Sequence, residues 1–597
     1  MRISNIVIKN YRNIQSVDVR LNNSTALIGD NNSGKSNILK AITLPFLSDD
    51  IGYTGKNLSW SDINNEEKSK YFQYLLNNRK EIKDGSFDLD DFTDALPKVI
   101  VEVTLEPETE EAYFVRNLAS EINEDGKICY QIRYEYFPKN VEDVVARVKE
   151  VFKLREIARK DTDNIESIKM NLLPMDLYSY SIMVPYKGSS VSYDDLKLFK
   201  YTALIAERDD FSRSSNKLGS KSLIKLLQMK LDTASKLKVE EEYTSFFDTL
   251  KDLGEMENIL NWQKNSDIPN AKDFFEKISI LPNMPNMSSL LSSVKLGYVN
   301  ENLSTQGLGH RNLILILVLL NSLIEREKDS ALSLITLEEP EAHLGISNKH
   351  LISSYINSFA KNDNSVQLVY STHSTEFINK IDFNNIIVVS DGQAVSLSNN
   401  LTETEKDYLS KNPNLDLYNF FLSKKCILVE GPSEELLIRS YISSKNMLSD
   451  IVVISFHKGF RGILNIWLKL NKGSKNRLGI VRDSDGQEKA KMAHEDYNQF
   501  ENILVSTTKE YTLEPEIVNT EGNYKILKPY FEETFNWVIK SKENIADQWT
   551  QAKASVMLRV CQDIASGHLS ELVLPTHIKE IIDFLSSTEN GGLGIDN

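Results

Sequence analysis

The segment ALIGDNNSGKSNILKAI, residues 26–42, limits the fold more than any other part of this 597-residue chain. The apolar residues Ala26 to Ile28 predict a short strand, and SNILKAI predicts the start of a helix. Between them lie the residues of the phosphate-binding spacing G-x-x-x-x-G-K-S, namely Gly29, Gly34, Lys35 and Ser36. A strand, a glycine-rich loop and a helix in this order predict an α/β fold that binds phosphates at the helix N-terminus.

The loop also predicts how the phosphates would be held. Gly29, Asn32 and Gly34 would let backbone N–H groups curl around them. Lys35 would reach the outer phosphates, and the Ser36 hydroxyl would bind Mg²⁺. We therefore expect bound ATP together with a magnesium ion.

Two later strands end in side chains that suit the same site. The run Leu332–Leu337 predicts a buried strand that is followed by Glu338 and Glu339. We expect Glu338 to hold the metal ion and Glu339 to polarise the attacking water. A further predicted strand, Leu368–Tyr370, precedes His373, which fits a sensor of the γ-phosphate, although a lone histidine is more often structural.

The segment NLSTQGLGH stands just before the longest apolar run of the chain. Backbone N–H groups near Ser304 and Gly307, at the start of a helix, could bind a phosphate. The apolar run itself, Leu313–Leu320, is shorter than the ~20 residues that a bilayer-spanning helix needs. We therefore expect a buried helix at this position and no membrane segment.

Acidic residues follow two further predicted strands in the last third of the chain. In CILVEGPSEELL, the strand Cys426–Val429 is followed by Glu430 and then by a helix that contains Glu434. In LGIVRDSDG, an apolar strand is followed by Asp483 and Asp485. The helices predicted between these strands indicate a parallel sheet, and ligands bind at the carboxyl ends of the strands in such sheets.

Two interpretations of these acids are open from the residues alone. An Asp and a Gly after a strand most often form a turn. Alternatively, Glu430, Asp483 and Asp485 converge without a positive partner, which favours a bound cation. Because all the ligands would be oxygen atoms, the cation would be Mg²⁺ or Mn²⁺.

The first set of motifs resembles the ABC-type ATPase head of the SMC, Rad50 and RecF group. The opening segment ISNIVIKNYRNIQSVDVRL resembles the β-hairpin of that group, and ALIAERD, residues 203–209, resembles its internal strand element. The resemblance implies that the signature, here with Ser304 and Gly307, completes the nucleotide site of another head. This signature departs from the Leu-Ser-Gly-Gly form of the group.

The later motifs resemble the TOPRIM domain of topoisomerases, primases and some nucleases. The complete order resembles the OLD (overcoming lysogenization defect) endonucleases, which include the nuclease subunit of Gabija anti-phage systems. This resemblance implies an ATP-regulated endonuclease that nicks or cuts double-stranded DNA with two divalent ions, in anti-phage defence. A homodimer or higher homo-oligomer is expected, with a helicase, or a reverse transcriptase with its RNA, as a candidate partner encoded nearby.

The resemblance also assigns roles to individual residues. The expected metal ligands of the nuclease site are Glu430, Glu434, Asp483, Asp485 and Glu514. Glu434 would serve the second ion, and Glu514, the late acid of the family, has acidic neighbours as rivals. Lys553 would neutralise charge on the scissile phosphate, and two other lysines compete for this role.

Two other functions compete with a nuclease. The first is an ATP-dependent DNA-binding scaffold of the SMC or RecF kind without nuclease activity, which the intact Glu430, Asp483 and Asp485 argue against. The second is a topoisomerase, which would need a nucleophilic tyrosine, and none of the 24 tyrosines is an evident candidate.

The predicted organisation is an α/β chain with an ATPase head interrupted by a helical insertion and followed by a TOPRIM domain. The expected parts are residues 1–205 and 291–400 for the head, 206–290 for the insertion, a dimerisation candidate, and 420–597 for the nuclease domain with C-terminal helices. The net charge of −16 argues against a generic basic nucleic-acid coat, so DNA would need a local basic stripe. Residues 217–230 and 469–477 are candidates. Three scattered cysteines and the absence of an apolar N-terminal stretch indicate a cytoplasmic protein.

Overall fold

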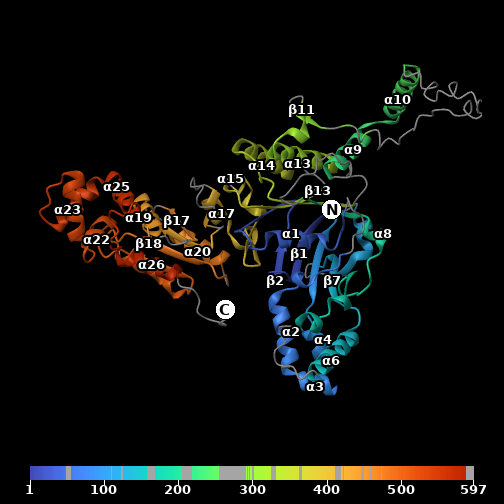
Figure 1. Cartoon of the computed structure of the whole chain (residues 1–597), viewed down its shortest axis with the longest axis horizontal. Coiled ribbons are helices and arrows are strands. Elements are labelled where there is room, and N and C mark those ends of the chain that lie inside the picture. Colours follow the sequence, from blue (N-terminus) through green and yellow to red (C-terminus); the bar gives the residue numbers. More distant parts are fainter. Residues whose placement is uncertain are drawn as a thin grey trace, which may run out of the picture.

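A computed structural model of the chain contains three main β-sheets with helices packed around them. The residues that it describes are 1–48, 56–108, 111–122, 126–157, 168–204, 218–253, 291, 294, 296–298, 301–324, 331–361, 366–378, 380–410, 419–420, 423–444, 450–456, 460–471 and 474–586. The third sheet and its helices, drawn in orange and red in Figure 1, lie to one side of the other two.

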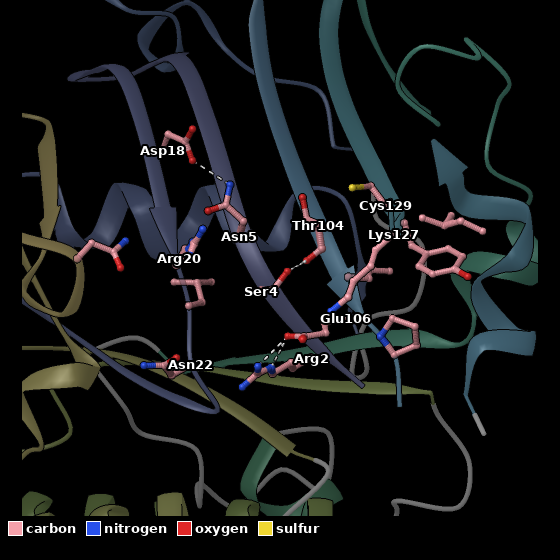
Figure 2. A pocket seen from close by; sticks show the side chains of 16 residues that line it. Arg2, Ser4, Asn5, Asp18, Arg20, Asn22, Thr104, Glu106, Lys127 and Cys129 are labelled. Atoms are coloured by element: carbon pink, nitrogen blue, oxygen red, sulfur yellow. Dashed lines mark hydrogen bonds and ion pairs between the residues drawn. The ribbon is translucent and has the colours of Figure 1, made fainter. Parts of the chain in front are cut away.

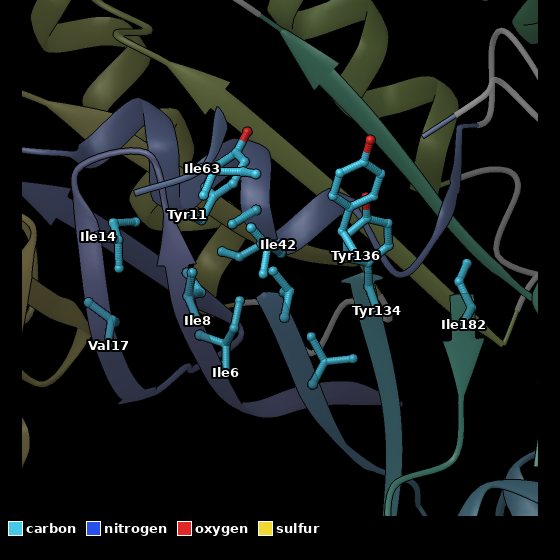
Figure 3. Packing of buried hydrophobic residues seen from close by; sticks show 14 of the residues in the cluster. Ile6, Ile8, Tyr11, Ile14, Val17, Ile42, Ile63, Tyr134, Tyr136 and Ile182 are labelled. Atoms are coloured by element: carbon cyan, nitrogen blue, oxygen red, sulfur yellow. The ribbon is translucent and has the colours of Figure 1, made fainter. Parts of the chain in front are cut away.

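The first sheet has six strands and begins with the predicted hairpin. Its strands are β1 (Arg2–Tyr11), β2 (Ile14–Arg20), β5 (Val99–Glu106), β6 (Ala119–Ile122), β7 (Ile128–Pro138) and β8 (Tyr178–Met183), all paired antiparallel. Residues of β5 alternate between buried and partly exposed, as expected for a strand with one face on a core. Apolar side chains of β1, β2 and β7 pack with Ile42 of α1 (Lys35–Thr43) in this core (Figure 3).

The second sheet carries the phosphate-binding loop. Its seven strands follow the order β15-β14-β3-β13-β12-β9-β4, and only the β14–β15 pair is antiparallel. The bounds are β3 (Ser24–Ile28), β4 (Leu47–Ser48), β9 (Phe199–Leu204), β12 (Leu332–Glu338), β13 (Val366–Thr372), β14 (Ile386–Ser390) and β15 (Gln393–Ser396). Helix α1 packs on one face, and α13 (Leu308–Ile324) and α14 (Ile346–Lys361) pack on the other. The strands predicted around residues 26, 335 and 369 are confirmed.

The third sheet has four parallel strands in the order β17-β16-β18-β19. The bounds are β16 (Lys425–Val429), β17 (Ile451–Ser455), β18 (Arg477–Arg482) and β19 (Ile503–Thr507), with α19 (Pro432–Ser444), α20 (Phe460–Leu470) and α21 (Glu488–Glu495) between them. Five helices follow: α22 (Leu513–Asn519), α23 (Asn523–Phe535), α24 (Lys542–Gln551), α25 (Lys553–Ala565) and α26 (Thr576–Ser586). The predicted parallel α/β unit is confirmed.

Strand β16 separates two apolar cores. Because successive side chains of a strand point to opposite faces, Ile427 and Val429 pack with the C-terminal helices, whereas Cys426 and Leu428 face the other way. The core around Cys426 and Leu428 also contains Ile28 and other side chains of the ATPase sheet. The second and third sheets therefore share one apolar core.

Further helices lie outside these layers. They include α2 (Asn65–Asn77), α3 (Arg79–Asp84), α4 (Leu89–Ala95), α6 (Val141–Ile157), α15 (Thr375–Ile378), α16 (Leu397–Asn400) and α17 (Glu403–Ser410). Within the predicted insertion, the structure describes α9 (Leu218–Lys230) and α10 (Thr233–Leu253), and the rest of residues 206–290 lies outside the described part, as do residues 205–209 of the ALIAERD segment. No helix of the described ranges is long and apolar enough to cross a membrane.

Candidate nucleotide and metal sites

The phosphate-binding loop connects β3 to α1, as the sequence predicted. Lys35 is 6% exposed, and its Nζ donates to the carbonyl oxygens of Gly29 (2.9 Å) and Asp30 (2.8 Å). Burial lowers the pKa of Lys35, and the carboxylates of Glu339, Asp30 and Glu341 oppose this shift. Ser36 is exposed at the first turn of α1, where its hydroxyl is accessible to a metal ion. The lysine is thus held by its own loop and lies near enough to Glu339 and Glu341 to be affected by their charges.

Strand register brings the other predicted ATPase residues to the same edge of the sheet. Glu338 pairs with Ser371 across β12 and β13, and Thr372 pairs with Ile28 across β13 and β3. The ring Nδ1 of His373 lies 3.3 Å from Glu339 Oε1. The acids after β12, the histidine after β13 and the loop after β3 therefore meet at the carboxyl ends of three adjacent strands.

A third acid in this region, Glu341, has no role in the sequence analysis. It is 2% exposed, and its Oε1 accepts hydrogen bonds from Thr372 Oγ1 (2.6 Å) and from the backbone N–H of His373 (3.2 Å). Burial raises the pKa of Glu341, whereas the hydrogen bond from Thr372 lowers it. The available signal was a third acid within four residues, since Glu341 follows Glu338, Glu339 and Pro340.

The signature residues are arranged differently from the loop. Ser304 lies in a short helical turn, Leu303–Thr305, and Gly307 is exposed immediately before α13. Helix α13 packs on the opposite face of the sheet from α1, and Asn312 Nδ2 lies 3.5 Å from the carbonyl oxygen of Ala342. The signature therefore begins a helix on the other side of the sheet that carries the loop.

The second group of acids lies at the carboxyl ends of β16 and β18. Val429 pairs with Val481, so Glu430 and Asp483 emerge from neighbouring strands at the same edge. Both Glu434, on α19, and Asp483 are buried. Asp485 is partly buried and follows them in the turn.

This turn is well anchored. Thr508 Oγ1 accepts a hydrogen bond from the backbone N–H of Ser484 (2.9 Å), and the N–H of Asp485 donates to the carbonyl oxygen of Tyr511 (3.2 Å). Asp485 and Gly486 both have positive φ angles, 48° and 67°. The turn interpretation and the site interpretation are therefore compatible, because the turn fixes the acids at the end of the strand.

Electrostatic coupling identifies which other residues face Asp483. The pKa of Asp483 is raised to about 8, first by burial and then by Glu434, Glu430 and Glu514, while Lys553 opposes the shift. The pKa of Glu434 is raised to about 7, first by burial and then by Glu514 and Glu430, again with Lys553 opposing. Five charged residues therefore lie close enough to influence one another electrostatically: Glu430, Glu434, Asp483, Glu514 and Lys553.

Among the rivals for the last two positions, the geometry separates Glu514 and Lys553 from the others. Lys553 Nζ lies 3.6 Å from Glu514 Oε1, and Glu514 is completely buried. Glu516 instead accepts a hydrogen bond from the backbone N–H of Glu510 (2.7 Å). The competing lysines, Lys540 and Lys542, are not among the charges that act on the buried acids.

The donor set fits a divalent cation. Glu514 Oε1 is buried and accepts no hydrogen bond, and its nearest positive partner, Lys553 Nζ, lies 3.6 Å away. The neighbouring acids raise the pKa of Asp483 and Glu434, so a bound cation would relieve the repulsion between these carboxylates. Across the described ranges, no group of three or more His, Cys, Asp or Glu side chains stands close enough together to hold a metal ion. The acids are therefore neighbours in one field rather than a preformed cage.

Arg482 is a second residue that sequence reasoning missed. It is 6% exposed at the end of β18, and its Nε lies 3.9 Å from Glu430 Oε1. Its Nη1 is buried without a hydrogen-bond partner. A charged residue directly between an apolar strand and Asp483 was the available signal. The guanidinium gives Glu430 a fixed positive neighbour.

The basic stripe at residues 469–477, a candidate for contact with DNA, stays a prediction, but its described residues do not lie beside the aspartates in space. Lys469 Nζ binds both carboxylate oxygens of Glu405 (2.7 and 2.8 Å), and Arg477 Nη1 donates to the carbonyl oxygen of Phe584. Arg477 starts β18, whereas Asp483 follows its end, so the strand separates them by roughly 20 Å at about 3.3 Å per residue.

A short turn connects the phosphate-binding loop to the amino ends of β16 and β18, the strands that lead to the second group of acids. The backbone N–H of Gly392, in the β14–β15 turn, donates to the carbonyl oxygen of Ser33 in the phosphate-binding loop (2.8 Å). The preceding residue, Asp391, forms an ion pair with Lys424 just before β16. Asn476 Nδ2 donates to Ser390 Oγ (3.1 Å) just before β18. We call these contacts the junction.

A polar hollow of about 1000 Å³ lies apart from both sites, on the exposed face of the first sheet (Figure 2). Its charged side chains include Arg2, Arg20 and Lys127 with Asp18 and Glu106. Arg2 and Glu106 form an ion pair, and Asn5 donates to Asp18. None of the residues predicted from the sequence lines this hollow.

The loop, the acids and the histidine at one sheet edge define a P-loop nucleotide-binding protein. Residues 1–378 match the AAA ATPase domain family, and the chain belongs to this family. The α/β fold class with an ATPase head is thereby confirmed.

Two curated relatives extend the likeness beyond the ATPase domain. Both are named Endonuclease GajA. The protein from Bacillus cereus strain HuB5-5 is 24% identical over 499 residues, which cover 73% of this chain and 66% of that protein. The one from strain VD045 is 23% identical over 455 residues, which cover 74% and 68%. The chain thus spans about two thirds of these relatives, and the predicted resemblance to endonucleases of this kind is confirmed.

Solved structures similar to this chain include three SMC heads. One is bound to the C-terminal winged-helix domain of ScpA (TM-score 0.29, 13% identity, covering 67% of this chain and 99% of that one). The second is from Thermotoga maritima (TM-score 0.26, 15% identity, covering 66% of this chain and 99% of that one). The third, with an extended coiled coil, is bound to the C-terminal domain of ScpA and derives from Pyrococcus furiosus (TM-score 0.30, 11% identity, covering 66% of this chain and 97% of that one).

Proposed function

We propose that the chain is an ATP-regulated, divalent-metal-dependent DNA endonuclease whose third sheet forms a TOPRIM-type site. One observation carries this proposal. Asp483, with a pKa raised to about 8, shares a buried field with Glu430, Glu434, Glu514 and Lys553 at the carboxyl edge of a parallel sheet. Such a cluster is costly to bury without cations, and the relatives named endonucleases support the DNA substrate.

The residues would divide the work as follows. Glu430, Asp483 and Asp485 would hold one Mg²⁺ or Mn²⁺ ion, and Glu434 and Glu514 a second. When bound, such ions supply an activated water and stabilise the leaving 3′ oxygen. Lys553 would neutralise charge on the scissile phosphate.

The ATPase site would use its own residues in a similar way. Lys35, now bonded to its own loop, would turn to the outer phosphates of ATP, and Ser36 and Glu338 would hold Mg²⁺. Glu339 would polarise the attacking water, and His373 would contact the γ-phosphate. Gly29, Asn32 and Gly34 would line the phosphates, and Ser304 and Gly307 would act on the site of a second copy.

The junction supports regulation of cleavage by ATP. The carbonyl oxygen of Ser33 in the loop is bonded to Gly392, and the flanking Asp391 is paired with Lys424 at the start of the strand that leads to Glu430. A change of the loop on nucleotide binding would thereby reach the nuclease sheet. The family resemblance further implies cytoplasmic anti-phage defence as a homo-oligomer, with a helicase or a reverse transcriptase and its RNA as candidate partners.

The test is cleavage of a supercoiled plasmid with Mg²⁺ or Mn²⁺, without nucleotide and with ATP or ADP. We expect nicked and linear products from the wild-type protein and none from Asp483→Ala, with ATP affinity unchanged. Glu510→Gln, an acid outside the shared field, is the matched control and should cleave normally. If no nucleotide state gives product while ATP changes DNA retention, the chain is a scaffold instead.

A second measurement does not depend on cleavage. Because Asp483 and Glu434 must lose their protons to bind a cation, Mn²⁺ affinity measured by calorimetry should rise between pH 6.5 and 8.5 with release of protons. The same affinity in the wild-type protein and in Asp483→Asn would remove this residue from the metal site.

A further inference from the structure

His373 is held from both sides by one buried network. Glu341 Oε1 accepts from Thr372 Oγ1 (2.6 Å) and from the backbone N–H of His373 (3.2 Å). The same Thr372 Oγ1 accepts from the backbone N–H of Ser374 (3.1 Å). The three consecutive residues 372–374 are therefore tied to a single carboxylate.

The histidine ring lies between two acids. Its Nδ1 is 3.3 Å from Glu339 Oε1 and 3.9 Å from Glu341 Oε1, while about half of the side chain is exposed. Glu339 stands at the turn after β12 with a positive φ of 43°, and its backbone N–H donates to the carbonyl oxygen of Ser371 (3.0 Å). The orientation of the ring thus depends on both the tip of β13 and the turn after β12.

Burial of the Glu341 carboxylate is energetically unfavourable, so stabilising a turn does not by itself explain this residue. Its second oxygen, Oε2, is buried without a hydrogen-bond partner, and an unsatisfied buried polar group destabilises the fold. Its charge also acts on Lys35 in the phosphate-binding loop. A carboxylate that binds the backbone of His373 and lies within the field of Lys35 is placed to serve the nucleotide site rather than the core.

We propose that Glu341 and Thr372 are positioning residues for ATP hydrolysis. They fix the backbone of His373 so that its ring stays against Glu339 and faces the γ-phosphate of a bound nucleotide. The proposal rests on membership of the ATPase family and not on the proposed nuclease activity.

Thr372 gives the sharper test, because Thr372→Val removes the hydroxyl at nearly constant volume and Thr372→Ser restores it. We expect Thr372→Val to lower kcat for ATP hydrolysis about 10- to 100-fold, with KM and ADP affinity within threefold of wild type. Thr372→Ser should recover most of the rate. Thr249→Val, which removes a hydroxyl bonded only within α10, is the matched control and should hydrolyse ATP normally.

A double variant separates positioning from general damage. If Thr372 acts through the histidine, His373→Ala combined with Thr372→Val should be no slower than His373→Ala alone, since residues that act as a unit are not additive. Glu341→Ala should behave like Thr372→Val, with thermal unfolding followed in parallel.

Three results would overturn the proposal. One is an unchanged kcat in Thr372→Val, and another is a loss that Thr372→Ser does not recover. The third is a wild-type protein that hydrolyses no ATP, since there would then be no reaction for these residues to support. Loss of plasmid cleavage alone would bear on the proposed nuclease and leave this result standing.

Discussion

Lys424 Nζ lies 2.7 Å from Asp391 Oδ1, so an ion pair joins the turn beside the phosphate-binding loop to the strand that leads to Glu430. The turn contains Gly392, whose φ is +77° and whose missing Cβ would lie 2.1 Å from the carbonyl oxygen of Asn13. No side chain fits there without moving the turn away from Asn13, whose Nδ2 itself donates to the carbonyl oxygen of Ser33 in the loop. A substitution at Gly392 therefore tests whether the nucleotide state of the loop controls the nuclease site.

Gly392→Ala should uncouple the two sites. We expect the ratio of plasmid nicking rates with and without ATP to move toward one, because the displaced turn no longer follows the loop. Gly188→Ala is the matched control: its φ is also positive, at +63°, but its Cβ would meet nothing within 4 Å. A variant that keeps the wild-type ratio would show that regulation takes another route.

Asp483→Asn should stabilise the metal-free protein. The pKa of Asp483 is raised to about 8 in the fold, so between pH 4 and pH 8 the folded state binds more protons than the unfolded state. The free energy of unfolding therefore falls as pH rises through this window, and asparagine removes that loss. We expect a gain of about 2 kcal/mol at pH 8 and almost none at pH 4.

Thermal unfolding in EDTA at several pH values checks this prediction. Asp547→Asn, an exposed acid on α24, should change the unfolding temperature little at any pH. An equal or smaller gain for Asp483→Asn at pH 8 than at pH 4 would contradict the burial argument.

Lys553→Gln should move the pH dependence of cleavage. Lys553 lowers the pKa of both Asp483 and Glu434, so its removal raises them further and shifts the acid limb of the pH–rate profile upward by about 0.5–1 pH unit. The maximal rate should also fall by about 10²-fold as a phosphate-neutralising charge is lost. Lys542→Gln, at the exposed start of α24, should leave the profile in place.

Gly479→Ala should destabilise the nuclease sheet. A Cβ at Gly479 would lie 2.4 Å from Ile581 Cγ2, because helix α26 packs directly on β18. We expect a loss of about 1–3 kcal/mol in urea unfolding from overpacking. The double variant Gly479→Ala with Ile581→Ala should lose less free energy of unfolding than the two single variants lose in sum. If the two losses simply add, the contact between these residues is not the cause.

Local patterns predicted most of the strand ends that carry chemistry. The loop after β3, the acids after β12, and Glu430 and Asp483 after β16 and β18 all follow short apolar runs, which fix both the strand and the direction of its end. Parallel register then brought those ends together without further information.

Features that depend on distant packing were missed or left open. Glu341 has a role only because Thr372 and His373 lie beside it across β12 and β13. The sequence does not separate Glu514 from its acidic neighbours, because only the fold places Lys553 of α25 3.6 Å from Glu514 of α22. The basic stripe at residues 469–477 lies close to Asp483 in sequence, but β18 separates Arg477 from Asp483 in space, and sequence spacing alone does not show this.

The apolar core shared by the second and third sheets has a consequence for dissecting the chain. It contains Ile28 and Val388 from one sheet and Leu428 and Ile480 from the other. The sequence places a domain boundary near residue 420. A cut there would expose the apolar side chains of the shared core on each fragment. The two halves should therefore melt in a single cooperative transition and aggregate when expressed alone.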